Sequence, residues 1–371
     1  GHADQILHKI RADHIVLANG HIERLISFRN NDLPGIMLAG SFEKYIQRYG
    51  VIPDISPVIF SNNSSSFSLI KKLIDLKCKP QAYVDSRSGD KIESNLLDII
   101  HKENIPLFTN AHVEGCDGKK QVEEISVRDS EGIITKLKSK MLCISGGFNP
   151  DVHLFTQSKG VLTWDDQYLT FKPSKSFQNT IVIGSAGGLF QYSKLVNDID
   201  SKLSFLNHEP IVNINFELNE SDNYSIEKLW ETKHEKKSRW SKSFIDLQND
   251  VTTKDLRQGI REGFDRIEHL KRFTTNSMGT DQGKISSINA LGIVSEILNK
   301  KVSEVGTTIY RPPYAPLSFA SIAGRSTYNF YDPERKTSIH EWHKKNGAVF
   351  EDVGQWKRPW YFKSHLEENL D

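Results

Sequence analysis

The chain has 371 residues, of which 37% are hydrophobic and 26% charged, so it is long enough to bury a sizeable core in two or three domains. Its net charge of +1 gives no overall field that would attract nucleic acid or an anionic membrane, and we expect neither as a partner. It lacks the apolar run of about 18 residues needed to span a bilayer, and its polar start does not resemble a signal peptide, so we expect a cytoplasmic protein.

The first predicted elements are those of an α/β domain. An apolar run over 15–20 predicts a buried parallel strand, and its small residues Ala18 and Gly20 are typical of a strand that stops where a cofactor lies close. The alternative for the tripeptide Ala18-Asn-Gly20 is a plain exit from a strand into a turn. A helix over 41–49, closed by Gly50, is expected to follow.

A second α/β unit is predicted over 54–140. The strand at 57–60 is followed by a turn, Ser61-Asn-Asn-Ser-Ser-Ser66, where a Rossmann fingerprint would have glycines. Because glycines let the backbone approach a pyrophosphate, these six side chains indicate a unit that keeps its packing role and has lost dinucleotide binding. A helix over 67–76 and a strand over 81–85 complete the pattern, and we expect Asp85 to be a solvated turn residue.

The strongest local cofactor signal comes after this unit. Strands between 105 and 137 lead back to the first domain at 141–147, which includes Gly147, and a strand over 180–183 then enters a glycine-rich turn and a helix over 189–199. Backbone amides at such a position favour anionic groups. The residues predicted to bind a cofactor here are Gly184, Ser185, Gly187 and Gly188. A tight turn between strand and helix is the alternative.

The rest of the chain reads as a linker, a helical module and an arm. The polar stretch 206–240 is interpreted as a linker or solvated crossing, and 241–305 as a helical module with a core spaced for a helix: Leu256, Ile260, Phe264, Ile267 and Leu270. A second helix is expected from 286 to 298, followed by an extended, proline-rich segment over 310–316.

One segment of the module could bind a phosphate group. Thr280, Gln282, Gly283 and Lys284 bring a hydroxyl, an amide, backbone N–H groups and a cation together where a loop enters a helix. A capped helix with a solvated lysine is the alternative. Arg311 could stack on or pair with a bound flavin, or lie free on the surface.

Metal and nucleophile chemistry is not predicted. Cys78, Cys116 and Cys143 are isolated in the sequence and are expected to be reduced thiols. His340 and His343 stand three apart without an identifiable third ligand, so no metal site is predicted. No arrangement of nucleophile and base stands out, and no catalytic residue is proposed.

The module resembles the ferredoxin-like domain of flavin-dependent amine and amino-acid dehydrogenases, which holds a two-iron cluster with four cysteines. The four matching positions here are Asp246, Gln248, Asp281 and Ser286. Since iron–sulfur clusters need thiolate ligands, we expect no cluster.

Longer strings narrow the resemblance. They are Asp246-Leu-Gln-Asn-Asp-Val-Thr252, Met278-Gly-Thr-Asp-Gln-Gly-Lys284, Val305-Gly-Thr-Thr-Ile-Tyr-Arg-Pro-Pro-Tyr314 and Phe350-Glu-Asp-Val-Gly-Gln-Trp-Lys-Arg-Pro-Trp-Tyr361. The chain resembles the alpha subunits of heterotetrameric sarcosine oxidases, over their central part only, without the N-terminal dinucleotide fingerprint or the C-terminal folate domain.

This resemblance implies an architecture. It predicts a partial two-dinucleotide-binding-domain flavoprotein fold, with an FAD/NAD(P)-binding-like α/β domain over 1–205, the linker, and a cluster-less helical domain over 241–305. Residues 306–371 would form an extended arm and the start of a folate-binding domain like the T-protein of the glycine cleavage system.

The resemblance also implies a function. The expected role is a non-catalytic subunit that binds NAD and shares FMN with a beta subunit, in a complex with beta, gamma and delta subunits. FAD would sit in the partner subunit and tetrahydrofolate on the C-terminal domain. Such a complex demethylates sarcosine to glycine and passes electrons through FAD and FMN to oxygen, giving hydrogen peroxide and either formaldehyde or methylene-tetrahydrofolate. The alternatives are a subunit of a related methylated-amine or dimethylglycine demethylase, and a cofactor-free assembly scaffold.

Overall fold

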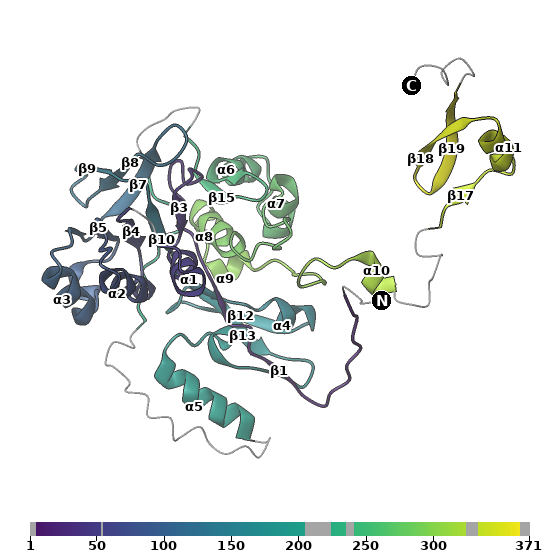
Figure 1. Ribbon diagram of the computed structural model, residues 1–371. Helices are drawn as coiled ribbons and strands as arrows, with labels where there is room; N and C mark the ends of the chain where they lie inside the picture. The colour runs from purple at the N-terminus through teal and green to yellow at the C-terminus, as the bar shows by residue number, and fades with distance from the viewer. Residues whose placement is uncertain (1–4, 53–54, 205–223, 235–240, 324–332, 364–371) are drawn as a thin grey trace. The chain divides into compact units, whose positions relative to one another are not determined.

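The computed structural model describes residues 5–52, 55–204, 224–234, 241–323 and 333–363. The chain divides into two compact units, a larger one of residues 12–315 and a smaller one made of residues 1–11 and 316–371. Figure 1 labels their helices and strands.

A five-stranded parallel sheet organises the larger unit. The strands lie in the order β3 (Ile36–Leu38), β10 (Leu142–Ser145), β4 (Val58–Ser61), β5 (Ala82–Asp85) and β6 (Leu107–Phe108). The whole of β4, β5 and β10 is buried, as expected for parallel strands covered on both faces. The predicted strands at 57–60 and 81–85 are confirmed to within one residue.

Alternate residues of the sheet enter two separate cores. Ile59, Tyr83 and Cys143 pack against a helical layer, formed by α1 (Ala39–Tyr49), α2 (Phe67–Asp75) and α3 (Ser94–Lys102). Val58, Phe60 and Val84 pack against the other layer, an antiparallel meander of β7 (His112–Asp117), β8 (Glu124–Arg128) and β9 (Ile134–Lys138). The result is a three-layer Rossmann-like unit (Figure 1).

A second α/β region is built from short strand pairs. Its members are the parallel pair β1 (Ile15–Leu17) and β14 (Thr180–Val182), and the antiparallel pairs β2 (His21–Glu23) with β11 (Phe148–Pro150) and β12 (Val161–Asp165) with β13 (Thr170–Lys175). Helix α4 (His153–Gln157) and the 3₁₀ turn η3 (Gly184–Gly187) accompany them. Helix α5 (Tyr192–Leu203) begins three residues later than predicted, because residues 189–191 are not helical and connect the glycine turn to the helix.

The helical module follows. It contains the pair β15 (Phe244–Asp246) and β16 (Val251–Thr252), and the helices α6 (Thr253–Arg261), α7 (Ile267–Thr274), α8 (Ser287–Leu298) and α9 (Val302–Val305). Gly263, with φ +95°, separates α6 from α7 where one helical stretch was predicted. The predicted core is nevertheless confirmed, since Leu256, Ile267 and Leu270 are buried and the other two members pack against them.

Part of the expected linker is packed rather than solvated. Residues 205–223 and 235–240 lie outside the described residues, but between them Trp230 is only 3% exposed. Its ring enters the core of the module and faces Gly292 of α8, where a Cβ atom would lie 2.3 Å away. The solvated crossing predicted for this stretch is therefore wrong for its described part.

The smaller unit contains α10 (Phe319–Ala323), α11 (His340–Lys345) and a three-stranded sheet of β17 (Arg335–Lys336), β19 (Trp356–Phe362) and β18 (Ala348–Val353). Within the described ranges, no helix has the length and apolar character needed to cross a membrane.

Candidate functional site

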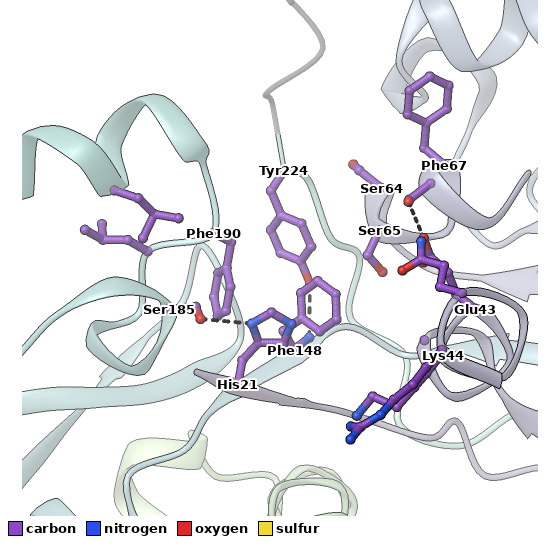
Figure 2. A pocket seen from close by; sticks show the side chains of 16 residues that line it. His21, Glu43, Lys44, Ser64, Ser65, Phe67, Phe148, Ser185, Phe190 and Tyr224 are labelled. Atoms are coloured by element: carbon purple, nitrogen blue, oxygen red, sulfur yellow. Dashed lines mark hydrogen bonds between the residues drawn. The ribbon is translucent and has the colours of Figure 1, made fainter. Parts of the chain in front are cut away.

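A cavity of about 850 Å³ opens between the two α/β regions of the larger unit. One wall comes from the short-strand region and η3, and the other from α1, the 3₁₀ turn η1 (Ser64–Ser66) and the start of α2. Figure 2 shows these walls facing each other: His21, Phe148, Phe190 and Tyr224 lie together with Ser185 on one side, and Glu43, Lys44, Ser64, Ser65 and Phe67 lie on the other. Its size is that of a small-molecule or cofactor pocket.

The aromatic wall is made by four rings: His21, Phe148, Phe190 and Tyr224. The rings contact one another, with centroids 4.0 Å apart for His21 and Phe148 and 5.2 Å apart for Phe190 and Tyr224. Burial lowers the pKa of His21 and so favours its neutral form, and its Nδ1 lies 2.9 Å from the hydroxyl of Ser185. Such a surface suits a flat ring, because aromatic rings stack favourably.

The polar wall presents side chains of α1 and η1. Lys44 and Arg48 stand one turn apart on α1 and line the cavity. Glu43 accepts hydrogen bonds from Gln47 Nε2 at 2.8 Å and from the hydroxyl of Ser68 at 2.6 Å, which ties α1 to α2. This wall therefore offers two cations beside a carboxylate that is already hydrogen-bonded.

The glycine-rich turn lies at the edge of the cavity. Gly184 and Gly188 adopt φ values of +71° and +87°, which only glycine accepts easily. Ser185 lines the cavity, and Gly187 completes η3. At Gly188 a Cβ atom would lie 2.9 Å from the side chain of Lys172.

The other predicted residues of this region lie nearby but outside the cavity lining. Gly20 has φ +82° and its carbonyl accepts a hydrogen bond from the Asp151 amide, while Ala18 directly follows β1. Gly147 has φ +97°, and its carbonyl accepts a hydrogen bond from the Arg24 amide at 2.8 Å. The structure thus brings Ser185 and the polar wall together, whereas Ala18 is exposed, Gly20 half-buried and Gly147 buried, all three outside the cavity lining.

The turn over 61–66, where a Rossmann fingerprint would have glycines, is occupied by the guanidinium of Arg87. Arg87, which is 1% exposed, donates from Nη2 to the carbonyl of Asn63 at 3.1 Å and from Nη1 to the hydroxyls of Ser64 and Ser225. It also forms a 2.8 Å ion pair with Asp85, which is completely buried. The prediction that Asp85 is a solvated turn residue is therefore wrong, because the end of β5 lies beneath the turn and a buried guanidinium satisfies its carboxylate.

In the helical module, the four positions that match cluster ligands have other roles. The Asp246 carboxylate accepts hydrogen bonds from the amides of Gln248, Asn249 and Ser277, and the Ser286 hydroxyl lies 3.0 Å from that of Ser277. Asp281 accepts a hydrogen bond from the amide of Gly283 at 3.0 Å. Within the described residues, no group of three or more His, Cys, Asp or Glu side chains is placed to hold a metal ion.

The side chains of the predicted phosphate-binding residues bind two different parts of the chain, the proline-rich arm and the loop at Gln248. Lys284 donates to the Tyr314 carbonyl at 3.0 Å, with its ammonium 3.8 Å from the centre of the Tyr314 ring. Thr280 donates to Gln248 at 3.3 Å. Gln282 binds the arm through the Pro313 carbonyl at 2.7 Å and the Arg311 amide at 3.0 Å.

A second cavity, of about 370 Å³, lies beside this arm. Its lining includes Gln282 and Arg311 from the predicted set, together with the cations Lys271 and Arg272 and the apolar Met278 and Ile309. Burial lowers the pKa of Lys271, and Arg311 and Arg272 add to this effect while Glu268 opposes it. The carboxylate of Glu268 also lines the cavity and pairs with Arg272 at 3.3 Å, so three cations, partly offset by one carboxylate, lie beside an apolar wall.

Several residues of the first cavity were not found by sequence reasoning. Lys44 and Arg48 could have been suggested by their spacing of four on a predicted helix. His21 and Tyr224 are separated by about two hundred residues and meet only through the β2–β11 pair, so no local pattern indicates them.

The comparisons with known proteins agree with this architecture. Residues 240–325 match the model of the sarcosine oxidase A3 domain. The chain is 32% identical over 371 residues to the sarcosine oxidase subunit alpha of Corynebacterium sp. (strain P-1), covering 97% of this chain and 38% of that protein. It is 33% identical over 362 residues to the subunit of the same name from Rhizobium meliloti (strain 1021), covering 96% of this chain and 35% of that protein. The chain therefore spans little more than a third of the length of these relatives.

Among solved structures, the L-proline dehydrogenase from P.horikoshii superimposes with a TM-score of 0.59 at 22% identity, over 85% of this chain and 59% of that one. This likeness concerns the fold, and it confirms the predicted dinucleotide-binding flavoprotein-like α/β fold followed by a small helical module. The resemblance to sarcosine oxidase alpha subunits that the sequence predicted is thereby confirmed over 95–97% of the chain, with residues 240–325 matching the A3 domain.

Proposed function

We propose that the chain serves in a sarcosine oxidase as a non-catalytic, cofactor-binding part of the alpha subunit. The complex would oxidise sarcosine with water and oxygen to glycine, hydrogen peroxide and formaldehyde, or transfer the one-carbon unit to tetrahydrofolate. Beta, gamma and delta subunits would complete it, and FAD in a partner subunit would oxidise the amine. The observation that supports this proposal is the identity of 32–33% over 95–97% of the chain to three curated alpha subunits.

NAD is the proposed ligand of the 850 Å³ cavity. The cavity adjoins the glycine turn of η3, its aromatic wall suits a nicotinamide or adenine ring, and Lys44 and Arg48 supply positive charge for phosphate groups. The second Rossmann-like unit would hold no dinucleotide of its own, because Arg87 fills its turn.

FMN is proposed for the 370 Å³ cavity, where it would be shared with the beta subunit. Its phosphate would bind Arg311 and Lys271, and its ring would lie against Met278 and Ile309. Lys284 would act indirectly, by holding the arm through the Tyr314 carbonyl.

One observation favours the second candidate function, a scaffold that binds no cofactor. The filled turn at Asn63 and Ser64 is what a cofactor-free scaffold would show. A related methylated-amine demethylase would share every feature described, because the amine would be selected on the partner subunit.

The NAD proposal is tested by Ser185→Leu in the assembled complex. The larger side chain removes the bond to His21 and intrudes on the cavity, so we expect NAD content to fall about 10-fold or more, equivalent to about 1.4 kcal/mol. NAD released by denaturation is quantified, and reduction of FAD by sarcosine should be unchanged.

The control is Ser204→Leu, the same change at an exposed position beyond α5. Full NAD content in Ser185→Leu would place the dinucleotide elsewhere. Absence of sarcosine-dependent peroxide formation by the unmodified complex would reject the enzyme assignment itself.

A further inference from the structure

Arg24 is a completely buried arginine behind the aromatic wall of the first cavity. Its guanidinium is held by carbonyl oxygens, those of Gly146 at 3.1 Å, Leu169 at 2.5 Å and Tyr168 at 3.4 Å. Among the described residues, no carboxylate lies within ion-pair distance of it. The ring of Trp230, with its centroid 5.2 Å from the guanidinium carbon, completes these surroundings. A buried cation without a carboxylate partner is costly to maintain, and its field acts strongly on neighbouring groups in a region of low dielectric.

The group that lies between this cation and the cavity is the hydroxyl of Tyr224. Its oxygen accepts a hydrogen bond from the Phe148 amide at 3.2 Å, and the Arg24 guanidinium lies beside it, since both adjoin the space in front of Gly147. A tyrosine hydroxyl also has one proton to donate. Within the described part of the chain, no acceptor is found for the proton, and Tyr224 lines the cavity.

Two further features keep this donor in place. Burial raises the pKa of Tyr224 to about 12, so the phenol keeps its proton at neutral pH. Gly147 leaves the space that the pair occupies, because a Cβ atom there would lie 2.6 Å from Arg24 Nη2 and 3.0 Å from the Tyr224 oxygen.

We infer that the Tyr224 hydroxyl, held by the Phe148 amide, donates a hydrogen bond to a carbonyl oxygen of a flat heteroaromatic ring that stacks on Phe148 and Phe190. This inference rests on the proposed NAD site and identifies one of its contacts, with the carboxamide of a nicotinamide ring as the matching chemistry. The ring contacts between Phe148, Phe190 and Tyr224, with centroids 5.2–5.9 Å apart, define the stacking surface.

The test compares Tyr224→Phe with the unmodified assembled protein. The change removes the donor and keeps the ring, and it leaves Arg24 its three carbonyl partners. We expect affinity for NAD and for free nicotinamide to fall roughly 2-fold to 10-fold, the range for one net hydrogen bond. Affinity for 3-methylpyridine, the same ring without the carbonyl, should not change. Calorimetry and ligand-observed NMR give these affinities.

The matched control is Tyr168→Phe, which removes the hydroxyl of a ring that contacts Phe190 but does not line the cavity. We expect it to bind both probes like the unmodified protein. Tyr224→His, which restores an N–H donor, should recover part of the lost affinity and guards against a general loss of folding.

The outcomes separate the two proposals. If Tyr224→Phe binds NAD and nicotinamide as tightly as the unmodified protein does, the Tyr224 hydroxyl is not a donor to the ligand, and the NAD site itself is not contradicted. Nicotinamide binding that depends on Tyr224, without NAD binding, would support the donor and reject NAD as the ligand. Failure of the unmodified protein to bind either compound would overturn both.

Discussion

Glu23 is a carboxylic acid held against the N-terminus of α1, one residue away from Arg24. Its Oε2 accepts a hydrogen bond from the amide of Gly40 at 2.7 Å, in the first turn of a helix whose N-cap residue, Leu38, makes no side-chain cap hydrogen bond. Burial raises its pKa from 4.5 to about 7, with a further contribution from Glu43, although the Gly40 and Ser145 hydrogen bonds oppose the change. Burial therefore outweighs the helix terminus, which by itself would favour the ionised form.

The raised pKa of Glu23 predicts a pH-dependent stability. The unfolded chain releases this proton near pH 4.5 and the folded chain near pH 7, so between those values the folded state holds more protons. The free energy of unfolding should then fall as the pH rises from about 4.5 to about 7, by up to about 3 kcal/mol from this group, and stay level above. Denaturant unfolding of the unmodified chain and Glu23→Gln, measured across that range, tests this.

In Glu23→Gln, the free energy of unfolding should lack this decrease between about pH 4.5 and about pH 7. Glu131→Gln, at an exposed turn, is the control and should retain it. Identical pH profiles for Glu23→Gln and the unmodified chain would contradict the assignment to Glu23.

At the scale of elements, the contact between Trp230 and α8 joins the segment 224–234 to the helical module. Nine consecutive residues of α8, from Ser287 to Ser295, are buried, and Gly292 is the position at which the helix meets the indole. Since a Cβ atom at Gly292 would lie 2.3 Å from the ring, the glycine is required by packing and not by backbone conformation.

This packing predicts that Gly292→Ala destabilises the chain. Alanine favours a helix by up to about 1 kcal/mol over glycine, but overpacking costs typically 1–3 kcal/mol, and the close backbone approach places this site at the upper end. We expect a net loss of about 1–2 kcal/mol, seen as a lower midpoint of thermal unfolding. Gly89→Ala, where a Cβ atom meets nothing within 4 Å, is the control. A stability equal to that of the control would mean that Trp230 does not pack on α8.

At the scale of the whole molecule, the chain combines a dinucleotide-type α/β fold with a helical module in which hydrogen bonds link the former ligand positions. The Asp246 carboxylate accepts hydrogen bonds from three amides and Ser286 pairs with Ser277, so these groups connect segments of the module. Electron transfer in the assembled enzyme would then run between flavins.

This arrangement predicts a protein free of iron–sulfur clusters. The purified assembly should contain neither iron nor acid-labile sulfide in stoichiometric amount, because carboxylate, amide and hydroxyl groups do not replace four thiolates. Colorimetric assays of both, with a cluster-bearing amine dehydrogenase as positive control, give the answer. A visible cluster spectrum with stoichiometric iron would refute the prediction.

The sequence by itself determined the local elements and the kinship. Parallel strands at Val58–Ser61 and Ala82–Asp85, the helix at Ser287–Leu298 and the module core were predictable, because apolar periodicity and glycine punctuation act over a few residues. The candidate serine, Ser185, was predictable for the same reason, since a glycine-rich turn after a β-branched strand is a local signal.

Only the tertiary structure decided which charged groups are buried and which residues meet. Asp85 and Arg87 could not be assigned from the sequence, because their burial depends on the turn at Asn63 folding over the end of β5. Arg24 and Tyr224 are about two hundred residues apart, and they meet because both pack against Gly147, directly before β11. Contacts between distant segments leave no periodic trace in a single sequence, because each partner satisfies only its own local preferences.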